Sequence, residues 1–211
     1  MAKAHTCIYV LAGTNGAGKS TIAGEMFRKA GTDYFNPDEA AKRILAVNPT
    51  INQEKANVLA WNEGKRMLKR SIAERLNFAF ETTLGGRTFT ALLHAALLEE
   101  IEVRIWYVGL ISPELHIARV RARVAGGGHD IPEATIRQRY NNSRLNLIQL
   151  LPGLTELKLY DNSKEANPDS GIAPEPRLIL HLVKGKVVQI CDLPTVPEWA
   201  KPVVAAALKF Q

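Results

Sequence analysis

The stretch Ala12–Thr21, AGTNGAGKST, decides the fold, and it begins at the last residue of the apolar run CIYVLA at Cys7–Ala12. From Gly13 to Ser20 it matches the phosphate-loop pattern, in which a glycine precedes four residues and then Gly-Lys-Ser. The glycines let successive backbone N–H groups turn inward around a polyphosphate, and the start of the next helix adds its positive dipole. We therefore expect a strand, a nucleotide-binding turn and a helix-like segment in this order.

The motif also gives its members candidate roles. Lys19 is expected to reach the β- and γ-phosphates of a nucleoside triphosphate, and Ser20 is expected to hold Mg²⁺. The candidate nucleotide-binding residues are Gly13, Thr14, Asn15, Gly16, Ala17, Gly18, Lys19, Ser20 and Thr21.

The composition is that of an ordinary globular protein: 211 residues, 46% hydrophobic and 23% charged. The longest apolar runs, such as Ala91–Leu98, are too short to cross a bilayer, and the N-terminus lacks the pattern of a signal peptide. We therefore expect a cytoplasmic protein with no membrane partner. Cys7 and Cys191 show no paired spacing, which favours two buried, reduced thiols. The net charge of +6 suits an anionic small substrate as well as a nucleic acid.

Strand-like and helix-like segments alternate along the chain, as is typical of parallel βαβ units in an α/β fold. Two clear helices are predicted at Ser112–Ala125 and Pro132–Leu150, because each opens with proline and glutamate. Gly126–Gly128 between them is interpreted as a flexible hinge. The predicted strands are Thr6–Ala12, Asp33–Phe35, Asn77–Thr82, Val103–Leu110 and Leu154–Asp161.

The sequence changes character after Asp161. Residues 162–176 are polar and rich in proline, and residues 177–190 alternate around Lys184-Gly185 in the manner of a β-hairpin. This tail is too short for a core of its own. We therefore predict one domain over residues 1–211, with its core at about residues 6–162 and a C-terminal hairpin appendage at about residues 163–211.

Two acidic residues follow predicted strands. Asp38 lies just after Asn36-Pro37, so it is either one acid of a well-capped helix or a base that accepts the proton of an attacking hydroxyl. Glu81 ends an apolar strand beside the predicted phosphate loop, where it could position substrate or the water shell of a metal. Arg87, in the loop after Gly85-Gly86, is a candidate for contact with an anionic group, although a solvated position is favoured for it.

Four arginines flank the glycine segment. Arg119 and Arg123 are four residues apart on one helical face, and Arg137 and Arg139 begin the next helix. Such a cluster is usually a solvated basic face. Two arginine-bearing helices joined by glycines also have the organisation of a lid that closes over a phosphoryl donor and stabilises the transferring group.

The combined pattern resembles the zeta-toxin family of P-loop kinases and the zeta-toxin-like bacterial ATPases. The matching segments, in the same order over about residues 6–162, are GTNGAGKST, NPD at Asn36–Asp38, FETT at Phe80–Thr83 and RVAGGGHDIPEATIRQRY ending at Tyr140. The resemblance implies a P-loop kinase-like, three-layer α/β/α fold with a mainly parallel sheet, a helical lid, and ATP with Mg²⁺ as phosphoryl donor.

The same resemblance suggests roles for site residues. It implies Asp38 as base, Glu81 and Thr83 on the substrate side, and Arg119, Arg123 and Arg139 on the phosphates, with Arg123 and Arg139 ranked first. The sequence departs from the toxins at Asn36, where they usually carry aspartate, and at Glu39–Ala41, where they carry an aromatic residue and an arginine. These departures leave the kinase machinery better supported than the toxins' nucleotide-sugar substrate.

The sequence therefore predicts an ATP-dependent kinase that phosphorylates a hydroxyl of a small molecule, with a nucleotide sugar as one candidate. Two other functions stay open. A nucleic-acid-end kinase would suit the positive charge, but the chain shows no basic strand interleaved with stacking aromatic residues, which makes nucleic acid an unlikely partner. In a non-catalytic switch the lid would only sense the γ-phosphate. An antitoxin protein is a further candidate partner on the resemblance alone.

Overall fold

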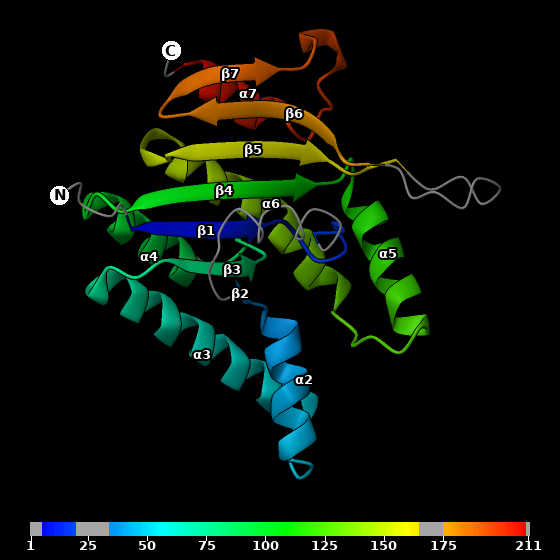
Figure 1. Cartoon of the computed structure of the whole chain (residues 1–211). Helices are drawn as coiled ribbons and strands as arrows, with labels where there is room; N and C mark the ends of the chain where they lie inside the picture. Colours follow the sequence, from blue (N-terminus) through cyan, green and yellow to red (C-terminus); the bar gives the residue numbers. More distant parts are fainter. Residues whose placement is uncertain (1–5, 20–33, 165–174, 210–211) are drawn as a thin grey trace.

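A computed structural model of the chain describes residues 6–19, 34–164 and 175–209. They contain seven strands in one sheet, in the order β2-β3-β1-β4-β5-β6-β7. The first five strands of this order are parallel, and β6 and β7 are antiparallel (Figure 1). The strands are β1 (Cys7–Ala12), β2 (Tyr34–Phe35), β3 (Phe78–Thr82), β4 (Glu102–Gly109), β5 (Glu156–Asp161), β6 (Arg177–Val183) and β7 (Lys186–Ile190).

Six α-helices accompany the sheet in the described residues: α2 (Pro37–Val47), α3 (Gln53–Glu74), α4 (Arg87–Leu98), α5 (Pro113–Ala125), α6 (Glu133–Leu150) and α7 (Lys201–Leu208). The expected α/β fold with a mainly parallel sheet is confirmed. The helix-like segment predicted after the phosphate loop, with Ser20 and Thr21, lies outside the described residues, as does Asp33 of the second predicted strand.

Local sequence signals set several helix ends. The side chain of Asn36 accepts hydrogen bonds from the backbone N–H groups of Asp38 and Glu39, so α2 begins as predicted at Pro37. Ser112 caps α5 in the same way through the N–H of Leu115. These caps satisfy donors that the first helical turn would otherwise leave without an acceptor.

The core forms on both faces of the central strands. Ile8 and Val10 of β1 point into the main cluster, which also includes residues of α4, α6 and α7. Leu11 points to the other face, where it packs with Trp106 and Val108 of β4. Strands buried on both faces need nearly continuous apolar sequence, which explains the run CIYVLA.

The predicted C-terminal hairpin is present and extends the sheet itself. Lys184 and Gly185 both have positive φ, as a two-residue hairpin turn requires, and Leu182 of β6 pairs with Leu157 of β5. Trp199, which is 2% exposed, stacks on Tyr107 with ring centroids 6.1 Å apart. The tail therefore contributes to the same hydrophobic core as the first five strands.

The two cysteines differ in exposure. Both are free thiols; Cys7 is buried, and burial raises its pKa to about 11. Cys191 is only partly buried, contrary to the prediction, because it directly follows the edge strand β7. A raised pKa keeps Cys7 in its unreactive thiol form.

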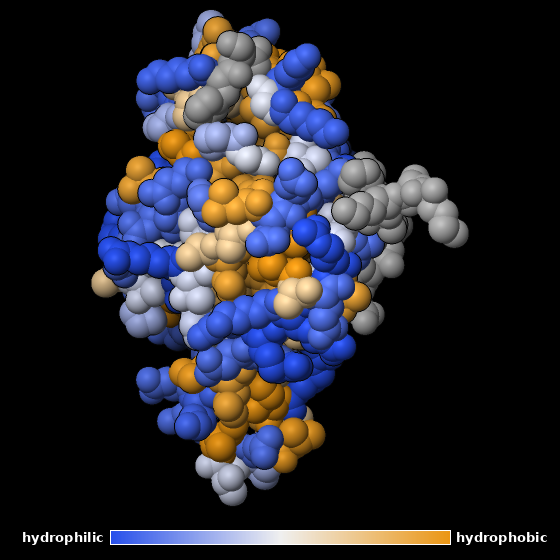
Figure 2. All heavy atoms as spheres, turned by 90° about the vertical axis from the view of Figure 1, so that its left-hand side faces the viewer, coloured by the Kyte–Doolittle hydropathy of each residue, from blue (hydrophilic) through white to orange (hydrophobic). Residues whose placement is uncertain are grey.

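Hydrophilic and apolar side chains both lie on the surface at the left-hand side of the molecule as drawn in Figure 1. On the face shown in Figure 2, apolar areas are divided from one another by charged and polar side chains, which is common for a solvated surface. Among the described helices, none has the length and apolar character needed to cross a membrane.

Replacing Trp199 by alanine tests whether the tail is part of the core. The substitution leaves a cavity against Gly109 and Tyr107 and removes the hydrogen bond from Trp199 Nε1 to Asp161 Oδ1 (2.9 Å). We expect the free energy of unfolding, measured by urea denaturation, to fall by about 3–5 kcal/mol. Leu193→Ala, at a side chain that is 57% exposed, is the control and should change it by less than about 0.5 kcal/mol. Equal, small effects of both substitutions would contradict the shared core.

Candidate functional site

The phosphate loop turns tightly at the carboxyl end of β1. Gly13 and Gly16 have φ of +142° and +81°, conformations that residues with side chains rarely adopt. A Cβ atom on Gly13 would lie 2.2 Å from the carbonyl oxygen of Val108, and one on Gly16 would lie 2.6 Å from that of His116. The loop therefore depends on glycine at these positions, and its concave turn fits a bound anion such as a polyphosphate.

The ammonium of Lys19 is held within this loop by a backbone carbonyl and a carboxylate. Its Nζ donates to the carbonyl oxygen of Gly13 at 2.9 Å and lies 3.3 Å from Glu81 Oε1. The side chain of Lys19 is 8% exposed, so the carboxylate compensates a largely desolvated ammonium. A phosphate would offer the same ammonium a second anionic partner.

Glu81 is itself fixed by Tyr34 of the edge strand β2 and by Asn36, the residue that caps α2. Tyr34 donates its hydroxyl hydrogen to Glu81 Oε2 at 2.8 Å, and Asn36 Nδ2 lies 3.4 Å from the same oxygen. Burial, together with the negative charge of Glu81, raises the pKa of Tyr34 well above its usual value. Tyr34 therefore remains a neutral hydrogen-bond donor to the carboxylate at physiological pH.

Two buried side chains from distant elements hold the loop from behind. His116 of α5 contacts the carbonyl oxygen of Asn15 through Nδ1 at 2.8 Å, and Asn162 Nδ2 donates to the carbonyl oxygen of Ala17 at 2.9 Å. Burial lowers the pKa of His116 to about 4. The imidazole is therefore neutral near pH 7, and its Nδ1 must carry the hydrogen because a carbonyl oxygen only accepts.

Two of the four predicted arginines face the phosphate loop or the predicted base. Arg139 of α6 donates from Nη1 to Asn15 Oδ1 at 2.8 Å, and burial lowers its pKa. Arg123, at the end of α5, lies with Nη1 3.9 Å from Asp38 Oδ2. The first arginine therefore faces the phosphate loop, and the second faces the predicted base.

The other two arginines make contacts elsewhere. Arg137 donates to Glu114 Oε1 at 2.6 Å on the outer side of the helix pair, and Arg119 donates to the carbonyl oxygen of Lys164 at 3.2 Å. Neither lines the cavity described below. Arg119 and Arg123 share a helical face, but α5 extends far enough that only its last turn reaches that cavity.

The helices α5 and α6 form a unit with a small core of its own. Ile117, Val120, Ile131 and Ile136 make up a cluster separate from the main core. The glycine segment between the helices is well hydrogen-bonded, because the N–H groups of Gly126, Gly127 and Gly128 all donate to carbonyls of the last turn of α5. These glycines therefore close the helix, a role that the hinge interpretation did not foresee.

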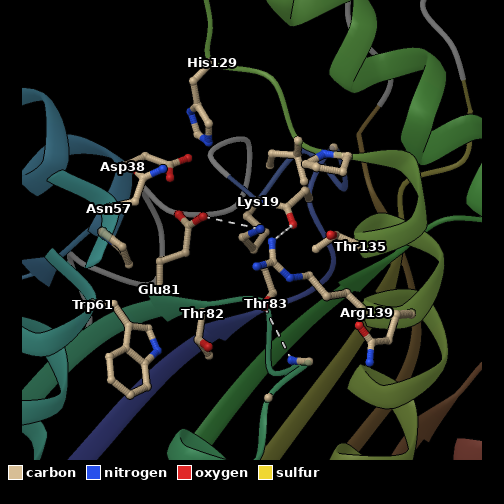
Figure 3. A pocket seen from close by; sticks show the side chains of 18 of the residues that line it. Lys19, Asp38, Asn57, Trp61, Glu81, Thr82, Thr83, His129, Thr135 and Arg139 are labelled. Carbon is tan, nitrogen blue, oxygen red and sulfur yellow. Dashed lines mark hydrogen bonds and ion pairs between the residues drawn. The ribbon is translucent and has the colours of Figure 1, made fainter. Parts of the chain in front are cut away.

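A cavity of about 660 Å³ opens beside the phosphate loop (Figure 3). Lys19 and Glu81 lie at its centre, Asp38, Asn57 and Trp61 on one side, and Thr135 and Arg139 on the other. The predicted residues that line it are Asn15, Gly16, Lys19, Asp38, Glu81, Thr83, Arg123 and Arg139.

Six of the predicted residues that the structure describes do not line this cavity: Gly13, Thr14, Ala17, Gly18, Arg87 and Arg119. Arg87 is the exposed first residue of α4, and Arg119 is directed to Lys164. Several lining residues were not predicted from the sequence, above all Asn57 and Trp61 of α3, which are four apart and thus share a helical face. Trp61 meets Phe89 of α4 edge to face, with centroids 6.0 Å apart. The other missed lining residues include Thr82, Thr88, Phe89, His129, Asp130, Thr135 and Gln138.

The described residues of the cavity suit a nucleotide, but they do not identify a metal site. The glycine turn and the cations of Lys19 and Arg139 together suit a triphosphate. The described residues include no group of three or more His, Cys, Asp or Glu side chains that could hold a metal ion. Ser20, the predicted Mg²⁺ ligand, lies outside the described ranges, so the metal remains a prediction.

Comparison with known proteins identifies a family and a fold. The family model of an AAA domain matches residues 8–143, more than half of the chain. An uncharacterized protein of Haemophilus influenzae is 30% identical over 128 residues, which cover 61% of this chain and 88% of that protein.

Solved structures give the same architecture at low sequence identity. A complex of AvrRxo1-ORF1 and ORF2 with ATP superposes with a TM-score of 0.65 at 13% identity, covering 96% of this chain and 64% of that one. The chain thus spans less than two thirds of that protein. A structure from the PezAT chromosomal toxin–antitoxin system of Streptococcus pneumoniae gives 0.54 at 13% identity, covering 100% and 87%. The fold is therefore of the P-loop kinase type.

The buried His116 should make stability depend on pH. Its folded pKa of about 4 lies below the ordinary 6.5, so the unfolded chain binds the proton more readily between these values. The neutral imidazole therefore stabilises the fold fully above pH 6.5, and this contribution is lost as pH falls toward 4. From pH 7 to 4 we expect a loss on the order of 3 kcal/mol from this group.

Urea denaturation at both pH values measures the effect. His116→Gln should lack this part of the pH dependence, whereas His94→Gln, at an exposed position of α4, should keep it. A His116→Gln variant with the full wild-type pH dependence would show that the histidine is not held neutral by the fold.

Proposed function

The chain belongs to the AAA domain family, and we propose that it is an ATP-dependent kinase that transfers the γ-phosphate to a hydroxyl of a small molecule. The observation that carries this proposal is that Lys19, Arg139 and Asp38 line a single cavity although they come from three distant parts of the chain. Phosphoryl transfer needs this combination, because cations must surround the phosphoryl oxygens and a base must stand beside the acceptor.

The donor side is the wall formed by the phosphate loop, Lys19 and Arg139. In the proposal the β- and γ-phosphates occupy the glycine turn, and Lys19 exchanges part of its contact with Glu81 for phosphate oxygens. Arg139 is hydrogen-bonded to Asn15 of the loop. A positioned guanidinium there suits the charge that develops on the equatorial oxygens in the transition state. Mg²⁺, held by Ser20, would neutralise the remaining charge of the phosphates.

The acceptor side is the wall formed by Asp38, Asn57 and Trp61. The acceptor oxygen attacks the γ-phosphorus, the bond to the β–γ bridging oxygen breaks, and ADP leaves. Asp38 takes the proton of the attacking hydroxyl, while Arg123, whose Nη1 lies 3.9 Å from Asp38 Oδ2, orients the carboxylate. The cavity volume of about 660 Å³ leaves room for an acceptor next to the triphosphate tail.

Within this function we place the chain among the zeta-toxin-like kinases. The motif order, the lid arginines, and similarity to folds from an ATP complex and a toxin–antitoxin system support that placement. Nucleotide sugars are therefore the first acceptors to test, and an antitoxin-like protein is the first partner to seek.

Lys19→Ala should remove most of the affinity for ATP. The ammonium between the β- and γ-phosphates is the charge expected to bind the triphosphate tail most directly. Isothermal calorimetry with ATP measures the loss, and Lys42→Ala, on the outer part of α2, is the control with the same loss of charge. Equal ATP affinity of the Lys19 variant and wild type would mean that the loop does not bind the triphosphate.

Asp38→Asn should abolish transfer while leaving the fold and ATP binding intact. The change is nearly isosteric and costs about 0.3–1 kcal/mol of helix-dipole interaction, whereas loss of a general base lowers kcat about 10²–10⁴-fold. Glu39→Gln, which removes the adjacent acid outside the cavity, is the matched control. Melting temperature, ATP affinity and turnover are measured on the same preparations. Turnover of Asp38→Asn within a few-fold of wild type would remove Asp38 from the mechanism.

The acceptor is identified by incubating the protein with γ-labelled ATP and, in separate reactions, pools of nucleotide sugars, small metabolites or oligonucleotides. The measured quantity is the label transferred to each pool. Label in either of the first two pools supports the proposal. Label at oligonucleotide ends instead favours the nucleic-acid-end kinase, and tight ATP binding without transfer to any pool favours the non-catalytic switch.

A further inference from the structure

We propose that Asn15 is a positioning residue that sets the catalytic geometry of Arg139 before any ligand binds. The inference rests on the proposed function, because it assigns a residue that aligns the arginine of that reaction. Asn15 is one of the variable residues of the phosphate-loop pattern, in which only the glycines, the lysine and the final hydroxyl are specified. The motif itself therefore does not require the hydrogen bond that the Asn15 side chain makes with Arg139.

The hydrogen bond between the two side chains is direct and shielded. Arg139 Nη1 donates to Asn15 Oδ1 at 2.8 Å, and Asn15 is only 9% exposed. A guanidinium has donors but no acceptor, so this contact fixes the amide with its oxygen toward the arginine. A hydrogen bond to a charged group in a shielded place is stronger than an ordinary surface contact.

Asn15 is itself anchored by its backbone. The buried His116 holds the carbonyl oxygen of Asn15 at 2.8 Å, so the peptide group does not depend on the arginine for its position. The neighbouring turn is closed by the hydrogen bond from the N–H of Ala17 to the carbonyl oxygen of Thr14 at 3.1 Å. The backbone of Asn15 is therefore held independently of Arg139, and it sets where the amide that meets the arginine begins.

The stem of Arg139 is confined on its other side by Gly85. A Cβ atom on Gly85 would lie 2.7 Å from Arg139 Cγ and 3.0 Å from its Cβ. Gly85 has no positive φ, so the backbone itself does not demand glycine there. Space for the arginine stem is therefore the reason visible in the structure for glycine at this position.

These contacts order a side chain that would otherwise have several rotatable bonds to fix during the reaction. Holding the guanidinium in place beforehand lowers the entropic cost of aligning it with the transferring phosphoryl group. The benefit appears in the transition state, where the charge on the equatorial oxygens is greatest, and only weakly in the binding of ATP.

The test compares binding of Mg²⁺-ADP with and without aluminium fluoride, a mimic of the transferring phosphoryl group that needs no acceptor. Asn15→Ala should weaken binding of the ADP–aluminium fluoride pair at least about tenfold and leave the affinity for ADP alone within threefold. Gly85→Ala, which displaces the arginine stem by another route, should do the same. Asn141→Ala removes an exposed amide that accepts from Arg144 outside the cavity, and it should match wild type in both measurements.

A double-mutant cycle shows whether Asn15 acts through Arg139. If it does, Asn15→Ala in an Arg139→Ala background adds less than about a twofold loss, because the interaction is already absent. Additive losses would overturn the inference, as would an Asn15→Ala chain that binds the mimic as tightly as wild type. A wild-type chain that binds ADP no more tightly with aluminium fluoride than without it would overturn it too.

The outcome is separable from that of the proposed function. Tight binding of the mimic that depends on Asn15, with no phosphate transferred to any acceptor pool, would disprove the kinase and leave the positioning role standing. Where transfer is found, Asn15→Ala should lower kcat at least about tenfold with little change in the KM for ATP.

Discussion

The close approach of Gly13 to the carbonyl oxygen of Val108 is the constraint on which the site depends. β1 lies between β3 and β4, so its loop must leave the sheet directly against the end of β4. A Cβ atom at Gly13 would lie 2.2 Å from that oxygen. Only a glycine allows the chain to turn here, and the turn determines where Lys19 and Asn15 lie relative to the strands on either side.

Around this turn the structure balances charge with few side chains. The ammonium of Lys19 lies beside Glu81 of β3, and Glu81 is fixed in turn by the hydroxyl of Tyr34 on β2. This pair keeps both charges compensated in a place with little solvent. It also means that an incoming phosphate competes with a carboxylate already present, so nucleotide binding and the position of Glu81 are coupled.

The helices above the cavity connect this site to the rest of the fold. α5 reaches the loop through His116, and α6 reaches it through Arg139, while its buried Leu147 and Leu150 belong to the main core. The small apolar cluster between the two helices holds their outer parts together. The two arginines that face the cavity are thus carried by one packed unit and not by independent loops.

The sequence by itself determined the features that depend on neighbours along the chain. The phosphate-loop turn, the helix starts at Asn36 and Ser112, the order of strands and helices, and the hairpin at Lys184-Gly185 follow from backbone sterics, capping and local periodicity. The tertiary structure alone decided which side chains meet. Arg123 and Arg119 share a helical face, yet only Arg123 lines the cavity, because Arg119, one turn earlier in α5, donates to the carbonyl oxygen of Lys164. Asn57 and Trp61 join the site because β3 lies between β2 and β1, which brings α3 alongside it; no pattern within α3 encodes that neighbourhood.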